Sequence, residues 1–142
     1  MKVLNIGHAG FRVKDMEKSL QFYCDGLGFK RAFTLYSQGE DSKPWIEYLA
    51  FGENQFVELF YCYDEKKDHP NLKEYYSIHH IALIVANIKE AYEELKEKGI
   101  VMKGEPRLGP DKTWQLWIVD PDGNELELME YTGESFQLVK NK

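Results

Sequence analysis

The pattern of apolar and polar positions repeats one transition at two places in the chain. Residues 8–13 and 80–85 are short runs rich in apolar and β-branched side chains, which is typical of strands. After each run, apolar residues recur at roughly helical spacing, as far as Gly26 in one case and Gly99 in the other. Glycine is the usual residue after a helix end. The pattern therefore predicts a strand followed by a helix, twice.

The two strand–helix segments also match position by position. At an offset of 72 residues, His8 matches His80 and Asp15 matches Asn87. Asp15 and Asn87 are both suited to cap the first turn of a helix, and Glu90 follows Asn87 at capping-box spacing. The repeat predicts that the chain consists of two related halves.

Three further strands are predicted behind each helix. The apolar runs lie between turn signals at residues 30–36, 45–51 and 55–61 in the first half, and at 101–108, 114–119 and 125–131 in the second. Each half then has the element order βαβββ. We expect the polar stretch 64–73 to link the halves and the tail after Glu130 to be loosely held.

Length and charge limit the classes of function. The 142 residues predict a single domain, with one module at about 5–63 and the other at about 76–131, neither stable alone. A net charge of −6 argues against binding to nucleic acid or an anionic membrane. We find no apolar run that could span a bilayer and no signal-peptide pattern. Two cysteines are too few for a disulfide scaffold, so we expect a cytoplasmic protein.

Four residues on the predicted strands combine into one candidate metal site. His8 and His80 lie on the first strand of their halves, and Glu58 and Glu127 lie on the last. If a pseudo-twofold axis relates the halves, the four side chains converge on one point. Two neutral imidazoles and two carboxylates balance the charge of a divalent first-row metal and leave positions for water or substrate oxygens.

Neighbouring residues compete for two of these positions. His79 adjoins His80, but strand alternation sends the two side chains to opposite faces, and the repeat favours His80. Glu130 lies at the strict repeat spacing, and Glu125 shares the parity of Glu127. We prefer Glu127 because the turn before it can absorb a small insertion or deletion, and Glu130 stays the alternative.

Parity also selects candidate substrate-binding residues. Arg12 shares the strand face of His8, and an inward arginine in an acidic protein suits an anionic substrate group, with a structural ion pair as the alternative. Phe56 and Phe60 share the face of Glu58. Aromatic residues of adjacent strands are candidate walls of a cavity, with core packing as the alternative: Trp45, Tyr48, Trp114 and Trp117.

Several motifs cover most of the chain: HAGFRVKD, SLQFY and GLGF, then FVEL, HIALIV and DPDGNELEL, within residues 6–131. Together they resemble the vicinal oxygen chelate superfamily of glyoxalases, bleomycin-resistance proteins and dioxygenases, and within it the glyoxalase I (lactoylglutathione lyase) group. The resemblance implies an α+β fold in which two paired βαβββ modules form a cupped, barrel-like mixed sheet around a central cavity. It also implies a homodimer, in which the cavity is often built from both chains.

The resemblance implies a set of ligands and a reaction. His8, Glu58, His80 and Glu127 would bind one divalent ion, Ni²⁺ or Zn²⁺. The substrate would be a hemithioacetal of methylglyoxal with glutathione or a similar thiol, isomerised through an enediolate to the S-2-hydroxyacyl thioester, with the metal as Lewis acid. Glu127 would act as base with Glu58 as its counterpart. Arg12 matches an arginine that contacts the glutathionyl carboxylate in some glyoxalases.

The sequence keeps other functions of the same fold open. The loop 105–112 lacks the paired glycines found before this strand in many bacterial glyoxalases, and Trp114, Gln115 and Trp117 are bulky there. One alternative is another metal-dependent enzyme, an epimerase, thiol transferase or dioxygenase. The other is a non-catalytic small-molecule binder of the bleomycin type, which needs an aromatic cavity but no metal.

Overall fold

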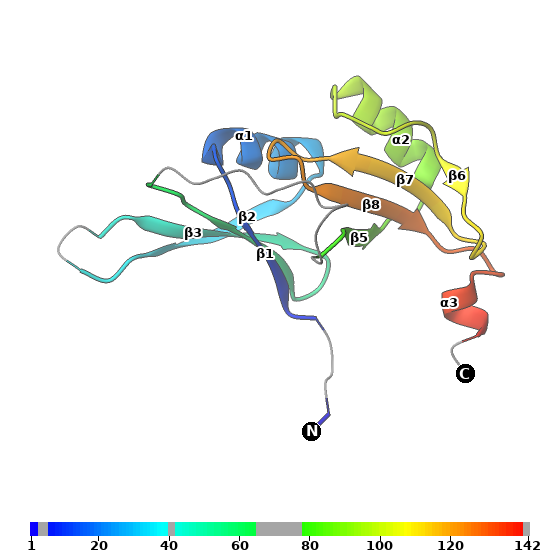
Figure 1. Cartoon of the computed structure of the whole chain (residues 1–142), viewed down its shortest axis with the longest axis horizontal. Helices are drawn as coiled ribbons and strands as arrows, with labels where there is room; N and C mark the ends of the chain where they lie inside the picture. Colours follow the sequence, from blue (N-terminus) through cyan, green and yellow to red (C-terminus); the bar gives the residue numbers. More distant parts are fainter. Residues whose placement is uncertain (3–5, 40–41, 65–77, 141–142) are drawn as a thin grey trace. The chain divides into compact units, whose positions relative to one another are not determined.

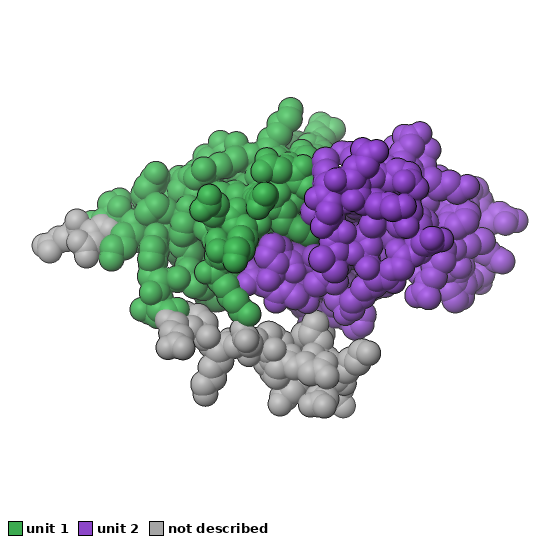
Figure 2. All heavy atoms as spheres, turned by 90° about the horizontal axis from the view of Figure 1, so that it is seen from above, with its two compact units in different colours: residues 1–68 green, residues 69–142 purple. Residues whose placement is uncertain are grey.

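The structure is a computed structural model of the chain, and it describes residues 1–2, 6–39, 42–64 and 78–140. The chain divides into two compact units, Met1–Asp68 and His69–Lys142, which Figure 2 colours green and purple. Most of the linker predicted at 64–73 lies outside the described residues. Each unit contains its own four-stranded sheet.

The first unit is a strand, a helix and three more strands. Its elements are β1 (His8–Arg12), α1 (Met16–Leu20), the π-helical turn η1 (Gln21–Gly26), β2 (Lys30–Tyr36), β3 (Pro44–Phe51) and β4 (Gln55–Phe60). The strands lie in the order β1-β4-β3-β2 (Figure 1). β1 runs parallel to β4, and the other neighbours are antiparallel.

Helix α1 and turn η1 cover one face of this sheet. Asp15 caps α1 by accepting a hydrogen bond from the backbone N–H of Lys18 at 3.1 Å, as the sequence predicts. Phe11 of β1 stacks on the fully buried ring of Tyr23, with centroids 6.0 Å apart. Because side chains alternate along a strand, the residues on either side of Phe11 face away from the helix. His8 shares that uncovered face.

The second unit repeats this plan. Its elements are β5 (Ile81–Ile84), α2 (Ile88–Glu97), β6 (Arg107–Leu108), β7 (Trp114–Val119), β8 (Glu125–Glu130) and α3 (Phe136–Val139). The sheet order is β5-β8-β7-β6, with β5 parallel to β8. Asn87 caps α2 by accepting from two backbone N–H groups, and Gly99 follows its end with a φ of 69°. No helix in the described ranges combines the length and apolar character needed to cross a membrane.

The predicted α+β class and the βαβββ order of each half are confirmed. The strands form two four-stranded mixed sheets, one in each unit, and neither sheet closes into a barrel. The arrangement of both modules as one domain around a central cavity stays a prediction.

The strand predicted at 101–108 is wrong in its first part. Regular pairing is confined to β6, and before it only Met102 makes an isolated bridge, with Ile118. Gly104 has a φ of 115°, which leaves the extended region, and Pro106 has no backbone N–H to donate. These two residues interrupt the ladder.

The tail after β8 is held in place, contrary to the prediction that it is loose. Ser135 is fully buried and accepts a hydrogen bond from the hydroxyl of Thr113 at 3.0 Å. Its own hydroxyl donates to the carbonyl of Lys112 at 3.1 Å, and the amide of Gln137 donates to Asp111 at 2.5 Å. Polar pairing with this turn, rather than apolar burial, fixes the tail.

Candidate functional site

A histidine and a glutamate meet on the uncovered sheet face of the first unit. His8 begins β1, and the parallel register places Gly10 beside Glu58 of β4. His8 Nδ1 lies 3.4 Å from Glu58 Oε1, and the Glu58 side chain is only 6% exposed. A carboxylate this deeply buried needs a charged, hydrogen-bonding or metal partner.

The second unit presents the same pair. His80 directly precedes β5, and its Nε2 atom lies 3.2 Å from Glu127 Oε2, whose side chain is 10% exposed. Ala82, which matches Gly10 in the sequence repeat, pairs with Glu127 just as Gly10 pairs with Glu58. The two carboxylates therefore occupy equivalent positions in their sheets.

The three glutamates of β8 have three different partners. Glu130 accepts a hydrogen bond from the backbone N–H of Ile88 at 2.7 Å, at the first turn of α2, and Glu125 pairs with Lys103. Glu127 is the one that meets a histidine. Register and contacts thus favour Glu127 over Glu130 as the counterpart of the carboxylate in the first unit. Strict repeat spacing misleads here because β8 is displaced by three residues relative to β5.

His79 and His80 do not point to opposite faces, so that prediction is wrong. Their Nδ1 atoms lie 2.8 Å apart. Both rings also meet the ring of Trp117 edge-on, with centroids 6.1 and 4.7 Å away. Because β5 begins only at Ile81, the alternation of a strand does not apply to the two histidines. The contact with His79 leaves the Nε2 atom of His80 turned toward the carboxylate.

The two pairs fit a divalent metal in chemistry and in spacing. Two donor atoms bound to one ion at about 2.1 Å, at angles between a right angle and the tetrahedral angle, lie about 3.0–3.4 Å apart. The observed separations of 3.4 Å and 3.2 Å fall in that range and are long for a charge-assisted hydrogen bond. In the part of the chain that the structure describes, no three His, Cys, Asp or Glu side chains gather around one point. The donors come as one pair in each unit.

Aromatic and cationic side chains surround the pair of the first unit. Phe56 and Phe60 flank Glu58 along β4, and the register places Phe60 beside Arg12. The guanidinium carbon of Arg12 lies 5.6 Å from the centre of the Phe60 ring. A Cβ atom at Gly10 would come within 3.2 Å of that ring, so glycine keeps the space above Glu58 open.

Of the aromatic candidates for a cavity wall, Trp45 and Trp117 lie near the pairs, but Trp114 does not. Trp45 meets Phe60 edge-on at 6.1 Å, and Trp117 contacts both histidines of the second unit. Trp114 lies under Lys89 of α2, whose Nζ atom is 5.9 Å from the ring centre. Strand alternation therefore places Trp114 on the helix side of its sheet, which excludes it from the wall.

Tyr48 has a polar role that the sequence did not reveal. It lies opposite Glu58 in the antiparallel β3–β4 ladder. A hydrogen bond to Glu58 raises the pKa of the Tyr48 phenol above its ordinary value. The signal that could have identified it is the register of β3 and β4, which depends on their connecting turn and is not evident from periodicity alone.

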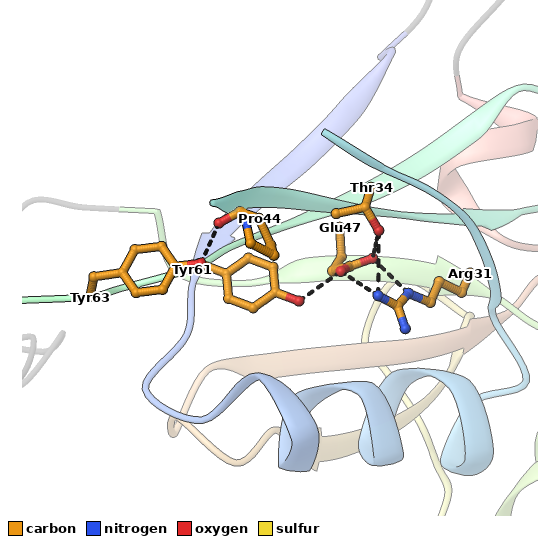
Figure 3. A network of polar contacts seen from close by, with 6 residues as sticks. All are labelled: Arg31, Thr34, Pro44, Glu47, Tyr61 and Tyr63. Atoms are coloured by element: carbon orange, nitrogen blue, oxygen red, sulfur yellow. Dashed lines mark hydrogen bonds and ion pairs between the residues drawn. The ribbon is translucent and has the colours of Figure 1, made fainter. Parts of the chain in front are cut away.

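The covered face of the first sheet carries another buried carboxylate, Glu47, which the sequence also did not single out. Arg31 donates to both of its oxygens, at 2.7 and 2.5 Å, and the hydroxyls of Thr34 and Tyr61 donate at 2.9 and 2.7 Å (Figure 3). Burial alone raises the pKa of Glu47, but these hydrogen bonds outweigh it and hold that pKa below its ordinary value. Burial and the bond to Glu47 raise the pKa of Tyr61 to about 12. A carboxylate so fully satisfied is structural.

A hollow with a volume of about 460 Å³ lies beside α1, η1 and β2. Its lining consists of Glu17, Leu20, Gln21, Cys24, Asp25 and Arg31. None of these is a predicted site residue. Burial raises the pKa of the Cys24 thiol, so this cysteine stays protonated near neutral pH and is not an activated nucleophile.

Known proteins share this sequence and this fold. A probable lactoylglutathione lyase from Synechocystis sp. is 35% identical over 128 residues, covering 87% of this chain and 92% of that protein. The metallothiol transferase FosB of Staphylococcus epidermidis is 28% identical over 131 residues, covering 90% of this chain and 82% of the transferase. The crystal structure of a glyoxalase family protein from Enterococcus faecalis matches with a TM-score of 0.75 and 27% identity, covering 89% of this chain and 97% of that one.

A family model agrees with these individual matches. The model of the Glyoxalase/Bleomycin resistance protein/Dioxygenase superfamily matches residues 5–128. That range includes both histidine–glutamate pairs and every strand of both sheets except the end of β8. The chain therefore belongs to the glyoxalase/bleomycin resistance protein/dioxygenase superfamily.

Proposed function

We propose that the protein is a metal-dependent lyase of the lactoylglutathione lyase type. It converts the hemithioacetal of methylglyoxal and a thiol, glutathione or a similar one, into the S-2-hydroxyacyl thioester. The observation that carries the proposal is the histidine–glutamate pair that recurs at the same register in both units. Membership of the superfamily and the 35% identical probable lactoylglutathione lyase favour proton transfer next to a carbonyl.

The proposed ligands of one divalent ion, Ni²⁺ or Zn²⁺, are His8, Glu58, His80 and Glu127. Their support is the chemistry of the set, since two neutral imidazoles and two carboxylates compensate a 2+ charge. When bound, the ion supplies Lewis acidity that stabilises negative charge on substrate oxygens. Each imidazole keeps its neighbouring carboxylate in place, at the distances given above.

The carboxylates move the proton. Glu127 accepts the proton from the carbon that bears sulfur and returns it to the adjacent carbon, which turns the ketone into an alcohol and the hemithioacetal carbon into a thioester carbonyl. Glu58 is its counterpart on the other face of the substrate. Both side chains are nearly buried, at 10% and 6% exposure, which limits competition from water for that proton.

The proposed substrate contacts are Arg12, Phe56, Phe60 and Trp117. Arg12 binds an anionic group of the thiol through its guanidinium, which lies over the Phe60 ring. Phe56 and Phe60 exclude water from the two sides of Glu58 along β4. Trp117 packs against the imidazole of His80 and fixes its orientation. The proposed working form is a cytoplasmic homodimer that acts on a small molecule.

Removal and return of the metal test this proposal. The purified protein is stripped with a chelator, reloaded with Ni²⁺ or Zn²⁺, analysed for bound metal, and assayed for thioester formation from methylglyoxal with glutathione and with other thiols. We expect one ion per site, no activity in the stripped protein, and activity restored by one of the two ions. A protein that binds the ion but isomerises no thiol adduct would exclude the lyase.

A thiol transferase is the second candidate, and the similarity to a metallothiol transferase favours it. Such an enzyme uses a metal site and a thiol but joins the thiol to an electrophile instead of moving a proton. Loss of free thiol in the presence of an electrophilic acceptor, with no isomerisation of the hemithioacetal, would support the transferase. The reverse result would support the lyase.

A further inference from the structure

We propose that Tyr48 is a positioning residue that fixes the carboxylate of Glu58 and so makes it unequal to its counterpart Glu127, which keeps the freedom to carry the substrate proton. The division of labour between the carboxylates rests on the proposed function. The hold of Tyr48 on Glu58 does not, because it follows from the geometry of the first unit alone.

The register brings the phenol to the carboxylate. Tyr48 and Glu58 are direct partners in the antiparallel β3–β4 ladder, so their side chains lie on the same sheet face. The hydroxyl of Tyr48 donates a hydrogen bond to the carboxylate. One oxygen of Glu58 thus faces Tyr48, and the carboxylate also lies next to His8.

The ring of Tyr48 is itself held from two sides. It stacks on Phe33 with a centroid separation of 4.3 Å and an interplanar angle of 18°. It also meets Phe56 edge-on, with centroids 6.2 Å apart. A phenol that is packed in this way delivers its hydroxyl to a fixed point.

The second unit lacks this arrangement at the equivalent place. The direct partner of Glu127 in the β7–β8 ladder is Trp117, which has no hydroxyl and whose ring packs against His80 at 4.7 Å. Among the residues that the structure describes, His80 is the side chain paired with the carboxylate of Glu127. One carboxylate therefore has two polar partners and the other has one.

This difference assigns different tasks to the two carboxylates. A lone pair of Glu58 that accepts from a phenol is not available to a substrate proton, and a carboxylate held at both ends is a well-placed metal ligand. Glu127 keeps more unoccupied lone pairs and fewer restraints, so it can move between its histidine and the substrate. The superfamily repeat thus yields one anchoring and one mobile carboxylate from equivalent strand positions.

A single hydroxyl tests the hold on Glu58. Tyr48→Phe removes it and keeps the stacked ring, and Tyr61→Phe is the matched control, since it removes a hydroxyl that donates to Glu47 on the other face. The affinity of the metal-free proteins for Zn²⁺ is measured by competition with a chelator, the visible spectrum is recorded with Co²⁺, and thermal unfolding reports on folding. We expect about ten-fold weaker affinity and shifted Co²⁺ bands for Tyr48→Phe only. Wild-type affinity and spectrum in that variant would overturn the proposal.

The division of labour needs a second comparison. At saturating metal, we expect Glu127→Gln to lower kcat by about ten-fold more than Glu58→Gln does. An equal or reversed loss would overturn the unequal roles while leaving the hold of Tyr48 in place. If the wild type binds metal but has no isomerase activity, the proposed function fails and the metal-affinity test of Tyr48 still stands. A wild type that binds no metal would overturn both.

Discussion

Arg31 binds both carboxylate oxygens of Glu47, through Nε at 2.7 Å and Nη2 at 2.5 Å. This pair lies on the helix-covered face of the first sheet, while Glu58 lies on the uncovered face. The same sheet therefore carries two buried carboxylates in opposite situations. Glu47 is enclosed by donors and stabilises the fold, whereas Glu58 has an imidazole at metal-ligand spacing.

Removing the partner of Glu47 is expected to destabilise the protein strongly. Arg31→Met leaves a fully buried carboxylate without its guanidinium, which we expect to cost about 3 kcal/mol in the free energy of unfolding at pH 7. Urea denaturation measures it. The double variant Arg31→Met with Glu47→Leu removes the unpaired charge and is expected to regain part of that loss. A double variant that is less stable than the single one would contradict this explanation.

The Glu47 network also predicts part of the acid sensitivity. The pKa of Glu47 is lower in the folded protein than its ordinary value, because hydrogen bonds from Arg31, Tyr61 and Thr34 outweigh the effect of burial. Its contribution to stability is therefore present above the unfolded-state pKa and is lost as the pH falls through the folded-state pKa. Urea denaturation between pH 7 and pH 3 is expected to show a shallower decline for Glu47→Gln than for the wild type. Parallel declines would exclude Glu47 as a source of the acid sensitivity.

The assignment of the ligand on β8 predicts opposite outcomes for two neighbouring glutamates. Glu127→Ala is expected to abolish tight metal binding, as is His8→Ala, because each removes a proposed ligand. Glu130→Ala is expected to keep the metal but to lose about 1 kcal/mol of stability, since Glu130 accepts from the N–H of Ile88 at the start of α2. Elemental analysis and thermal unfolding distinguish the two effects. Loss of metal in Glu130→Ala with retention in Glu127→Ala would reverse the assignment.

The role proposed for Arg12 predicts a change in substrate affinity. Arg12→Met keeps an apolar contact with Phe60 but removes the positive charge, so KM for the thiol adduct is expected to rise by about ten-fold while kcat changes little. Arg12→Lys keeps a charge without the planar fork and is expected to be intermediate. Steady-state kinetics at saturating metal measures both. An unchanged KM in Arg12→Met would exclude a contact with an anionic substrate group.

Local patterns in the sequence were sufficient for the elements and the repeat. The helix caps at Asp15 and Asn87, the helix stop at Gly99 and the strand–helix order follow from residues that are close in sequence, and the structure confirms them. The strand expected at 101–108 failed because the apolar pattern outweighed Gly104 and Pro106 in the prediction. The tail failed because its fixation depends on hydrogen bonds to a turn more than 20 residues away.

The sequence by itself determined which residues can act: two histidines and two glutamates at repeated positions in two βαβββ halves. Only the tertiary structure decided which side chains these residues meet. It paired Glu127 rather than Glu130 with a histidine, brought Tyr48 to Glu58, and enclosed Glu47 on the covered face. The physical reason is register, because strand pairing joins residues far apart in the sequence, and a displacement of a single residue changes the face that each side chain occupies.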